Sequence, residues 1–225
     1  MRGMINLTAA DGHTCAAYQT LPHASPPAAG LVVVQEIFGV NAHIRDVCDR
    51  LTAAGYATLA PALFDRALRG VELDYDAGGV ARGRKIREQV GEDGPLADVA
   101  AAVARLRPLG RVGIIGFCWG GSLAWLAATR LGVAAAVGYY GGQIAQHLDE
   151  KPDCPVLLHF GEKDASIPVA DAEAVRAAHP EVAVHLYPAG HGFNCDRRAS
   201  YHAESAALAG RRTLAFLDSH LARPA

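Results

Sequence analysis

The sequence predicts an α/β fold, in which a mostly parallel central sheet carries helices on both faces. Short apolar, β-branched runs such as 31–34 and 112–115 are typical of strands that are buried on both sides. Longer segments with apolar residues at helical spacing alternate with these runs along the 225 residues, as in consecutive β-α-β units. A chain of this length suits one domain, which we expect to span residues 1–225.

Each expected element follows from its own pattern. A strand at 31–34 follows a loop-like stretch at 22–30, and a helix over 44–51 has Asn41 as its N-cap and Gly55 as its stop. Further strands are expected at 56–59, 112–115, 134–139, 156–160 and 182–186, and further helices at 95–106, 122–129, 169–178 and 203–220.

The polar, glycine-rich segment 65–94 interrupts this alternation. Only its portion 82–89 has the pattern of a short exposed helix. We therefore expect the segment to leave the sheet as an excursion, and we name it a candidate lid.

Composition excludes several classes of function. The 21 basic and 23 acidic residues give a net charge of -2 without a basic block, which argues against a nucleic-acid partner. No stretch reaches the roughly 18 apolar residues of a membrane span, and no apolar leader is visible, so we expect a cytoplasmic protein without a membrane partner. The five cysteines and ten histidines show neither a disulfide pattern nor metal-ligand spacing, so we expect no metal and no cofactor.

The strongest chemical signal is a thiol between glycines. Residues 112–121 read VGIIGFCWGG, which is a strand pattern followed by the nucleophile elbow G-x-S-x-G with Cys118 in place of serine. The alternative is an inert buried thiol, because free cysteine is among the most buried residue types. A structural cysteine does not need the flanking glycines, so we favour a covalent nucleophile whose ionisation must be controlled.

Two later strand-end loops supply partners for this thiol. The carboxyl ends of parallel strands meet at one edge of a sheet, so Asp164 after the strand at 156–160 and His191 after the strand at 182–186 can converge on Cys118. The order nucleophile, acid, histidine is that of the α/β-hydrolase triad. Glu162 and Asp171 compete for the role of acid, but Asp164 is placed best, just past the strand. For His191 the alternative is an ordinary loop histidine.

An early strand-end loop completes the expected site. In this fold the oxyanion donors are the amide after the nucleophile and an amide after an early strand, which here are Trp119 and Ile37. Glu36 precedes Ile37, and its carboxylate would repel a thiolate in the same cleft. Its alternative interpretation is a simple surface charge.

Four segments together resemble one known family. They read QEIFGVN at 35–41, GFCWGG at 116–121, VGYYG at 137–141 and AGHGF at 189–193. This combination, spread over nearly the whole chain, resembles the dienelactone hydrolases, also called carboxymethylenebutenolidases.

The resemblance implies an α/β-hydrolase fold and a triad of Cys118, His191 and Asp164, with Ile37 and Trp119 as the oxyanion hole. It also implies that Glu36 holds the resting thiol and is displaced when substrate binds, so that it helps to deprotonate the thiol. The implied substrate is an anionic dienelactone, which is hydrolysed to maleylacetate.

Family members bind the carboxylate of the substrate with arginines, one in the excursion and one soon after the catalytic histidine. At the second place this chain reads Asn-Cys-Asp at 194–196 and reaches arginine only at Arg197 and Arg198. Each arginine has an alternative interpretation as a solvated surface charge. The candidate substrate-binding residues are Phe38, Tyr140, Arg82 and Arg84.

We therefore expect a hydrolase that opens a lactone or small ester, with dienelactone as its substrate. One alternative is a broader carboxylesterase or thioesterase with the same triad. Another is a non-catalytic protein that binds or senses small molecules through its thiol. The sequence makes no prediction of oligomeric state.

Overall fold

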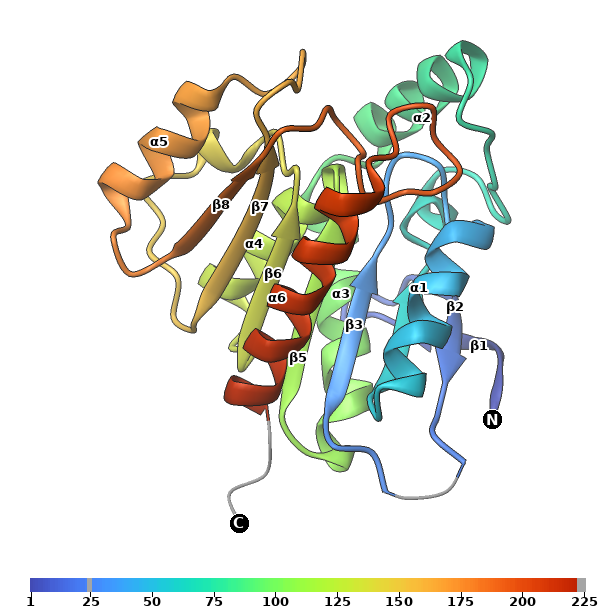
Figure 1. Ribbon diagram of the computed structural model, residues 1–225. Coiled ribbons are helices and arrows are strands. Elements are labelled where there is room, and N and C mark those ends of the chain that lie inside the picture. Colours follow the sequence, from blue (N-terminus) through green and yellow to red (C-terminus); the bar gives the residue numbers. More distant parts are fainter. Residues whose placement is uncertain (24–25, 222–225) are drawn as a thin grey trace.

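A single twisted sheet forms the centre of the molecule (Figure 1). The computed structural model describes residues 1–23 and 26–221, so residues 24–25 of the predicted loop and residues 222–225 of the predicted domain lie outside it. The strand order is β1-β2-β4-β3-β5-β6-β7-β8. The strands are β1 (Arg2–Thr8), β2 (Thr14–Thr20), β3 (Gly30–Val34), β4 (Ala57–Pro61), β5 (Val112–Phe117), β6 (Ala135–Tyr139), β7 (Val156–Gly161) and β8 (Ala183–Tyr187).

The strands from β4 to β8 in this order pair in parallel, whereas β1 and β2 are antiparallel to their neighbours. The predicted mostly parallel sheet is thus confirmed. The β1–β2 hairpin was not predicted, because Leu7 is the only fully buried side chain of β1, and an exposed edge strand has little apolar alternation.

Helices cover both faces of the sheet, as predicted (Figure 1). On one face lie α1 (Ala42–Ala53) and α6 (Ala203–Leu221), and on the other lie α3 (Asp93–Leu106), α4 (Trp119–Arg130) and α5 (Val169–Ala178). Short 3-10 turns occupy Leu63–Arg66, Arg107–Leu109 and Ile144–Gln146. No helix in the described part of the chain is both long and apolar enough to cross a membrane.

Helix α1 begins as the sequence predicts. The Asn41 side chain accepts a hydrogen bond from the Ile44 amide at 3.3 Å and so caps the helix. Ile44, Val47 and Leu51 then turn into the core at helical spacing. This start places the loop between β3 and α1 at the carboxyl edge of the sheet.

The excursion contains a longer helix than predicted. Helix α2 (Ala77–Val90) lies above the carboxyl edge of the sheet, and Asp76 caps it by accepting from the Gly79 amide at 2.6 Å (Figure 1). A Cβ on Gly83 would lie 2.0 Å from the carbonyl oxygen of Ile37. Glycine at 83 therefore lets α2 press directly on the loop after β3.

Ion pairs hold the beginning of the excursion to the body of the protein. Arg66 makes two hydrogen bonds of 2.8 Å to the fully buried carboxylate of Asp98, and Arg45 binds both carboxylate oxygens of Glu72. The side chain of Asp65 accepts from the amides of Ala16 and Gly70. These contacts fix the position from which α2 starts.

The sharp turn between β5 and α4 depends on one close contact. A Cβ on Gly116 would lie 1.9 Å from the carbonyl oxygen of Gly120. We expect Gly116→Ala to lower the free energy of unfolding by about 2 kcal/mol or more, because two backbones would have to separate in a packed core. Urea unfolding measures this loss.

Gly210→Ala is the matched control, since nothing lies within 4 Å of a Cβ at this position in α6. There alanine should raise stability by up to about 1 kcal/mol through helix propensity. Equal effects of the two substitutions would contradict the importance of the contact at Gly116.

Candidate active site

Cys118 stands at the junction of β5 and α4 in a strained conformation. Its φ is 54°, a value that residues other than glycine rarely adopt. Its amide donates to the carbonyl of Tyr139 at 2.9 Å, and its carbonyl accepts from Gly121 at 2.9 Å. The strand-to-helix turn therefore holds the half-buried thiol out toward the carboxyl edge of the sheet.

The three residues predicted to act together do lie together. The Nε2 atom of His191 is 3.1 Å from Sγ of Cys118, and its Nδ1 atom is 2.7 Å from Oδ2 of Asp164. The imidazole thus bridges a thiol and a carboxylate, each within hydrogen-bond distance of a different ring nitrogen.

The surroundings of His191 favour its charged form. Burial disfavours the charge, but the adjacent Cys118 sulfur and the Asp164 carboxylate outweigh burial and raise the pKa of His191 to about 10. His191 is thus suited to carry a positive charge beside the Cys118 sulfur near neutral pH.

Asp164 is oriented by the chain that follows it. Its other oxygen, Oδ1, accepts from the amides of Ser166 at 2.8 Å and Ile167 at 3.2 Å. Of the two competing acids, Glu162 is exposed to solvent and Asp171 lies in the first turn of α5. The structure therefore brings Asp164, and not its competitors, to the imidazole.

Both residues predicted to supply oxyanion donors line the same cavity as the thiol. Ile37 and Trp119 line it together with Cys118, and neither amide has an acceptor in the described part of the chain. Gln35 fixes the backbone beside Ile37 because its side chain accepts from the Leu63 amide and donates to the Glu36 carbonyl, both at 3.1 Å. Two free amides next to the nucleophile are what an oxyanion requires.

Glu36 is fully buried and held by residues that the sequence did not connect with it. Arg198 donates to its Oε1 at 2.8 Å and the hydroxyl of Tyr75 donates to its Oε2 at 3.0 Å. It is therefore not the surface charge that we considered as an alternative. It also differs from the resting arrangement implied by the resemblance, since here the thiol is partnered by His191 and the carboxylate by Arg198.

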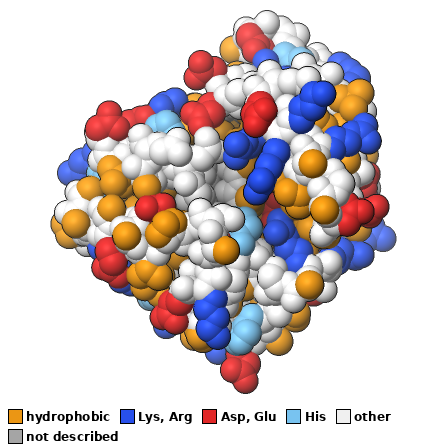
Figure 2. All heavy atoms as spheres, turned by 90° about the horizontal axis from the view of Figure 1, so that it is seen from above, with side chains coloured by type: hydrophobic (Ala, Val, Ile, Leu, Met, Phe, Trp, Pro, Cys, Tyr) orange, Lys and Arg blue, Asp and Glu red, His pale blue; other side chains and the backbone are white. Residues whose placement is uncertain are grey.

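The cavity above Cys118 has a volume of about 650 Å³. Arg84, Arg87 and Arg198 line it, and neither Arg84 nor Arg87 forms an ion pair within the described residues. Figure 2 looks down on this edge of the sheet and shows a hollow with blue lysine or arginine side chains at its rim. The cavity is therefore suited to a small anion.

Of the candidate substrate-binding residues, only two line this cavity. These two are Arg84 and Phe38. The Arg198 guanidinium also lies over the Phe38 ring, 4.9 Å from the ring centroid. Arg82 instead lines a separate surface hollow beside Arg69, because residues two apart in a helix point about 200° from each other. Tyr140 is fully buried behind the site, with its ring centroid 5.1 Å from that of His191.

The sequence analysis did not assign three residues to the site that the structure places there. Arg87 is three residues from Arg84, so helical spacing places both on one face and could have identified it. Arg198 had been noted only for its shifted position in the sequence. Tyr75 carries no local signal, because its contact with Glu36 spans 39 residues and depends on how the excursion folds.

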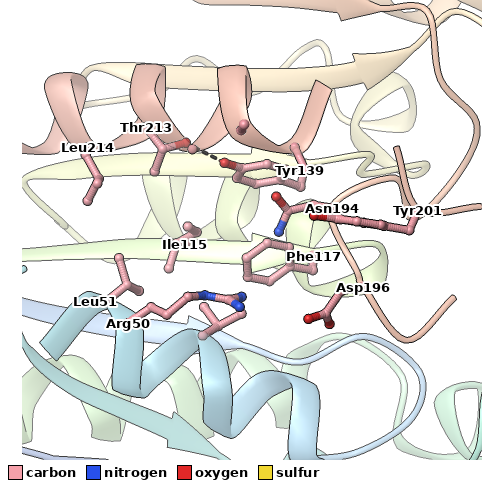
Figure 3. A pocket seen from close by; sticks show the side chains of 14 residues that line it. Arg50, Leu51, Ile115, Phe117, Tyr139, Asn194, Asp196, Tyr201, Thr213 and Leu214 are labelled. Atoms are coloured by element: carbon pink, nitrogen blue, oxygen red, sulfur yellow. Dashed lines mark hydrogen bonds between the residues drawn. The ribbon is translucent and has the colours of Figure 1, made fainter. Parts of the chain in front are cut away.

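A second cavity lies between α1 and α6, on the face of the sheet that these helices cover (Figure 3). It measures about 300 Å³, and its walls include Phe117, Tyr139, Asp196 and Thr213. None of the predicted site residues lines it. It is therefore not the site of the chemistry proposed for Cys118.

Comparisons with known proteins agree with this geometry. A carboxymethylenebutenolidase from Pseudomonas putida is 37% identical over 224 residues, which cover 95% of this chain and 94% of that protein. A crystal structure from Klebsiella pneumoniae, named as a provisional dienelactone hydrolase, shares 34% identity and superposes with a TM-score of 0.81 over 95% of this chain and 98% of that one. A dienelactone hydrolase from Anabaena variabilis, at 15% identity, shares the fold with a TM-score of 0.72 over 98% of both chains.

The fold and the site thus define a hydrolase of the α/β-hydrolase class that acts on esters. Residues 15–221 match the model of the dienelactone hydrolase family, and the chain belongs to that family.

The raised pKa of His191 leads to a pH-dependent prediction. A histidine whose pKa is raised in the folded state stabilises that state fully at a pH below its unfolded-state pKa of about 6.5. This stabilisation is lost as the pH rises through its folded-state pKa. We expect the stability difference between the wild-type protein and His191→Gln to shrink by about 1–3 kcal/mol between roughly pH 6 and pH 10. Urea unfolding at each pH measures it.

The control is His220→Gln, which changes a histidine near the end of α6, outside the site. Its stability difference from the wild-type protein should not follow the same trend. A difference for His191→Gln that grows with pH would contradict the ion pair.

Proposed function

We propose that this chain hydrolyses a small anionic lactone through Cys118 as covalent nucleophile, with dienelactone as substrate and maleylacetate as product. The observation that carries this proposal is the continuous contact from Asp164 through His191 to Cys118, at the floor of a cavity with three arginines. The family relationship supports the choice of substrate.

The reaction proceeds in two halves. The Cys118 thiolate attacks the lactone carbonyl, and the amides of Ile37 and Trp119 stabilise the resulting oxyanion. The ring C–O bond then breaks, and His191 donates its proton to the departing enol oxygen. This leaves an acyl group on sulfur and a neutral imidazole, which accepts a proton from water as the water attacks the thioester and regenerates the thiolate.

The nature of the leaving group explains why a thiolate suffices. An enolate is stabilised by conjugation and leaves readily, so the tetrahedral intermediate need not return to the thiolate. An amine would leave far less easily than sulfur. The site is therefore suited to enol lactones and activated esters rather than to amides.

Glu36 is proposed to control the thiol. Its carboxylate is held by Arg198 and Tyr75 here, and a substrate carboxylate that binds Arg198 competes with it for the guanidinium. We propose that Glu36 exchanges between Arg198 and the thiol, so that occupation of the cavity by an anion is coupled to deprotonation of Cys118.

The reducing environment of the cytoplasm suits this chemistry. All five cysteines are free thiols, which is typical of proteins that do not meet an oxidising compartment. By its resemblance to the family, we place the activity in the breakdown of aromatic compounds.

A broader carboxylesterase is the second candidate. A cavity of about 650 Å³ with Ile37, Phe38, Val80 and Ile167 in its walls has room and apolar surface for larger acyl groups. Brisk turnover of neutral aryl esters without turnover of cis- or trans-dienelactone would favour this candidate.

Cys118→Ala should abolish hydrolysis, with a loss of at least about 10³-fold in kcat, because no other thiol or hydroxyl among the described residues lies within hydrogen-bond distance of a ring nitrogen of His191. Product analysis with both dienelactone isomers measures this loss. Cys154→Ala is the control and should keep full activity, because this half-buried thiol does not line the cavity. Stoichiometric acylation of the wild-type protein without product release would instead indicate a binding or sensing protein.

Arg87→Gln and Arg84→Gln should each raise KM for an anionic substrate about tenfold, because each removes an unpaired positive charge from the cavity wall. KM for a neutral aryl ester should change little. Arg82→Gln is the matched control on the same helix, and it should leave both values unchanged. An equal effect of Arg82→Gln would indicate a general loss of positive field rather than a substrate contact.

A further inference from the structure

A buried histidine outside the proposed reaction makes no side-chain hydrogen bond within the described part of the chain. His43 lies on α1 and is fully buried, yet neither of its ring nitrogens has a hydrogen-bond partner among the described residues. Leaving a buried polar atom unpaired costs about 1–3 kcal/mol, and an apolar residue would fill this helix position without that cost. An imidazole with a free nitrogen is, however, the commonest protein ligand for metal ions.

Two further potential ligands lie beside this ring. The Cys195 sulfur, a Glu36 oxygen and a His43 nitrogen all lie within 4.8 Å of one another, and all three residues are buried. They come from the loop after β8, the loop after β3 and α1 respectively, so the fold brings together what the sequence keeps far apart. We call these three residues the buried cluster.

The donor types of the buried cluster point to zinc. Thiolate, imidazole and carboxylate are the three ligand classes of protein Zn²⁺ sites. Bond lengths of about 2.0–2.3 Å in a tetrahedron place neighbouring ligand atoms roughly 3.3–3.8 Å apart. A contraction of at most about 1.5 Å would therefore bring the buried cluster to this geometry.

Asp196 can supply the fourth ligand and a route to the cluster. Its Oδ1 atom is 3.7 Å from Nδ1 of His43, and about half of its side chain is exposed. Asp196 and Phe117 both line the cavity between α1 and α6 (Figure 3). The ring centroids of Phe117 and His43 are 6.1 Å apart. His43 thus lies directly behind the wall of an open cavity.

Charge also balances in such a site. The Arg198 guanidinium, which pairs with Glu36, would repel a metal ion bound to the same carboxylate. This repulsion is the main free-energy cost of metal binding. A Cys195 thiolate, Glu36 and Asp196 together neutralise both Zn²⁺ and Arg198. The thiol gives up its proton to solvent on binding, so no charge is left uncompensated.

We propose that Glu36, His43 and Cys195, with Asp196 as outer ligand, form a Zn²⁺ site whose occupation inhibits the enzyme. The inhibitory effect rests on the proposed function of Glu36, because a carboxylate bound to zinc cannot exchange with the Cys118 thiol. The binding of zinc does not depend on that function.

Binding is tested in a Cys118→Ala background, which removes the catalytic thiol as a competing ligand. Isothermal calorimetry should show one Zn²⁺ per chain, and Co²⁺ should give a thiolate-to-cobalt charge-transfer band in the near ultraviolet. Adding Cys195→Ala should remove the band, and adding His43→Phe should weaken Zn²⁺ binding about tenfold or more. Adding Cys154→Ala, the matched thiol control, should change neither.

Three results would overturn the site: no binding at about millimolar Zn²⁺, a cobalt band that survives Cys195→Ala, or an unchanged affinity in His43→Phe. Because Cys195→Ala alters a packed position, circular dichroism checks its fold. If the Cys195→Ala variant does not fold, the affinity of His43→Phe for Zn²⁺ decides whether the site exists.

Inhibition is tested with the otherwise wild-type enzyme and a neutral aryl ester. The Zn²⁺ concentration for half inhibition should rise about tenfold in His43→Phe, in parallel with its weakened binding. Equal inhibition of both proteins would assign the effect to Cys118 and overturn the inhibitory role. A chain that hydrolyses neither the ester nor dienelactone would refute the proposed function but leave the cobalt result standing.

Discussion

The buried carboxylate of Glu36 organises the site more than any other group. A charge with no exposed surface must be paired, and its partners come from two other segments, Arg198 in the loop that carries His191 and Tyr75 in the excursion. Glu36 is itself the neighbour of Ile37, which lines the cavity. The ion pair with Arg198 and the hydrogen bond from Tyr75 together link the loop after β3, the loop that carries His191 and the excursion, and removing Arg198 would leave the Glu36 charge stranded in the interior.

The second constraint is the backbone contact at the elbow. Because Gly116 and Gly120 touch, β5 can pass directly into α4, and Cys118 must accept a positive φ. This turn sets the direction of the sulfur, and the carboxyl edge of the sheet brings His191 within 3.1 Å of it. The reactivity that we propose for the thiol therefore depends on its neighbours, while its position depends on the backbone contact between the flanking glycines.

The sequence was most informative where sheet topology fixes position. Cys118, Asp164 and His191 each follow an apolar strand, and parallel strands end at a common edge, so their meeting could be predicted without knowing any side-chain contact. The exposed β1 strand carries too little apolar alternation to be recognised. Arg82 and Arg84 were taken together, although helical geometry separates them.

The contacts of Glu36, His43 and Cys195 could not be predicted at all. His43 and Cys195 lie 152 positions apart, and neither belongs to a recognisable motif. Spacing rules for metal ligands detect donors that one short segment supplies. They do not detect donors that α1 and two loops bring together only after the core has formed.

The close approach of Gly83 to the carbonyl of Ile37 lets α2 rest directly on the loop after β3. The helix that presents Arg84 and Arg87 to the cavity is thus supported by the same peptide segment that we propose to polarise the substrate carbonyl. A larger residue at 83 would displace both together. Substitution of Arg84 or Arg87 in the cavity wall can therefore change the substrate range while the contact at Gly83 that supports the helix is kept.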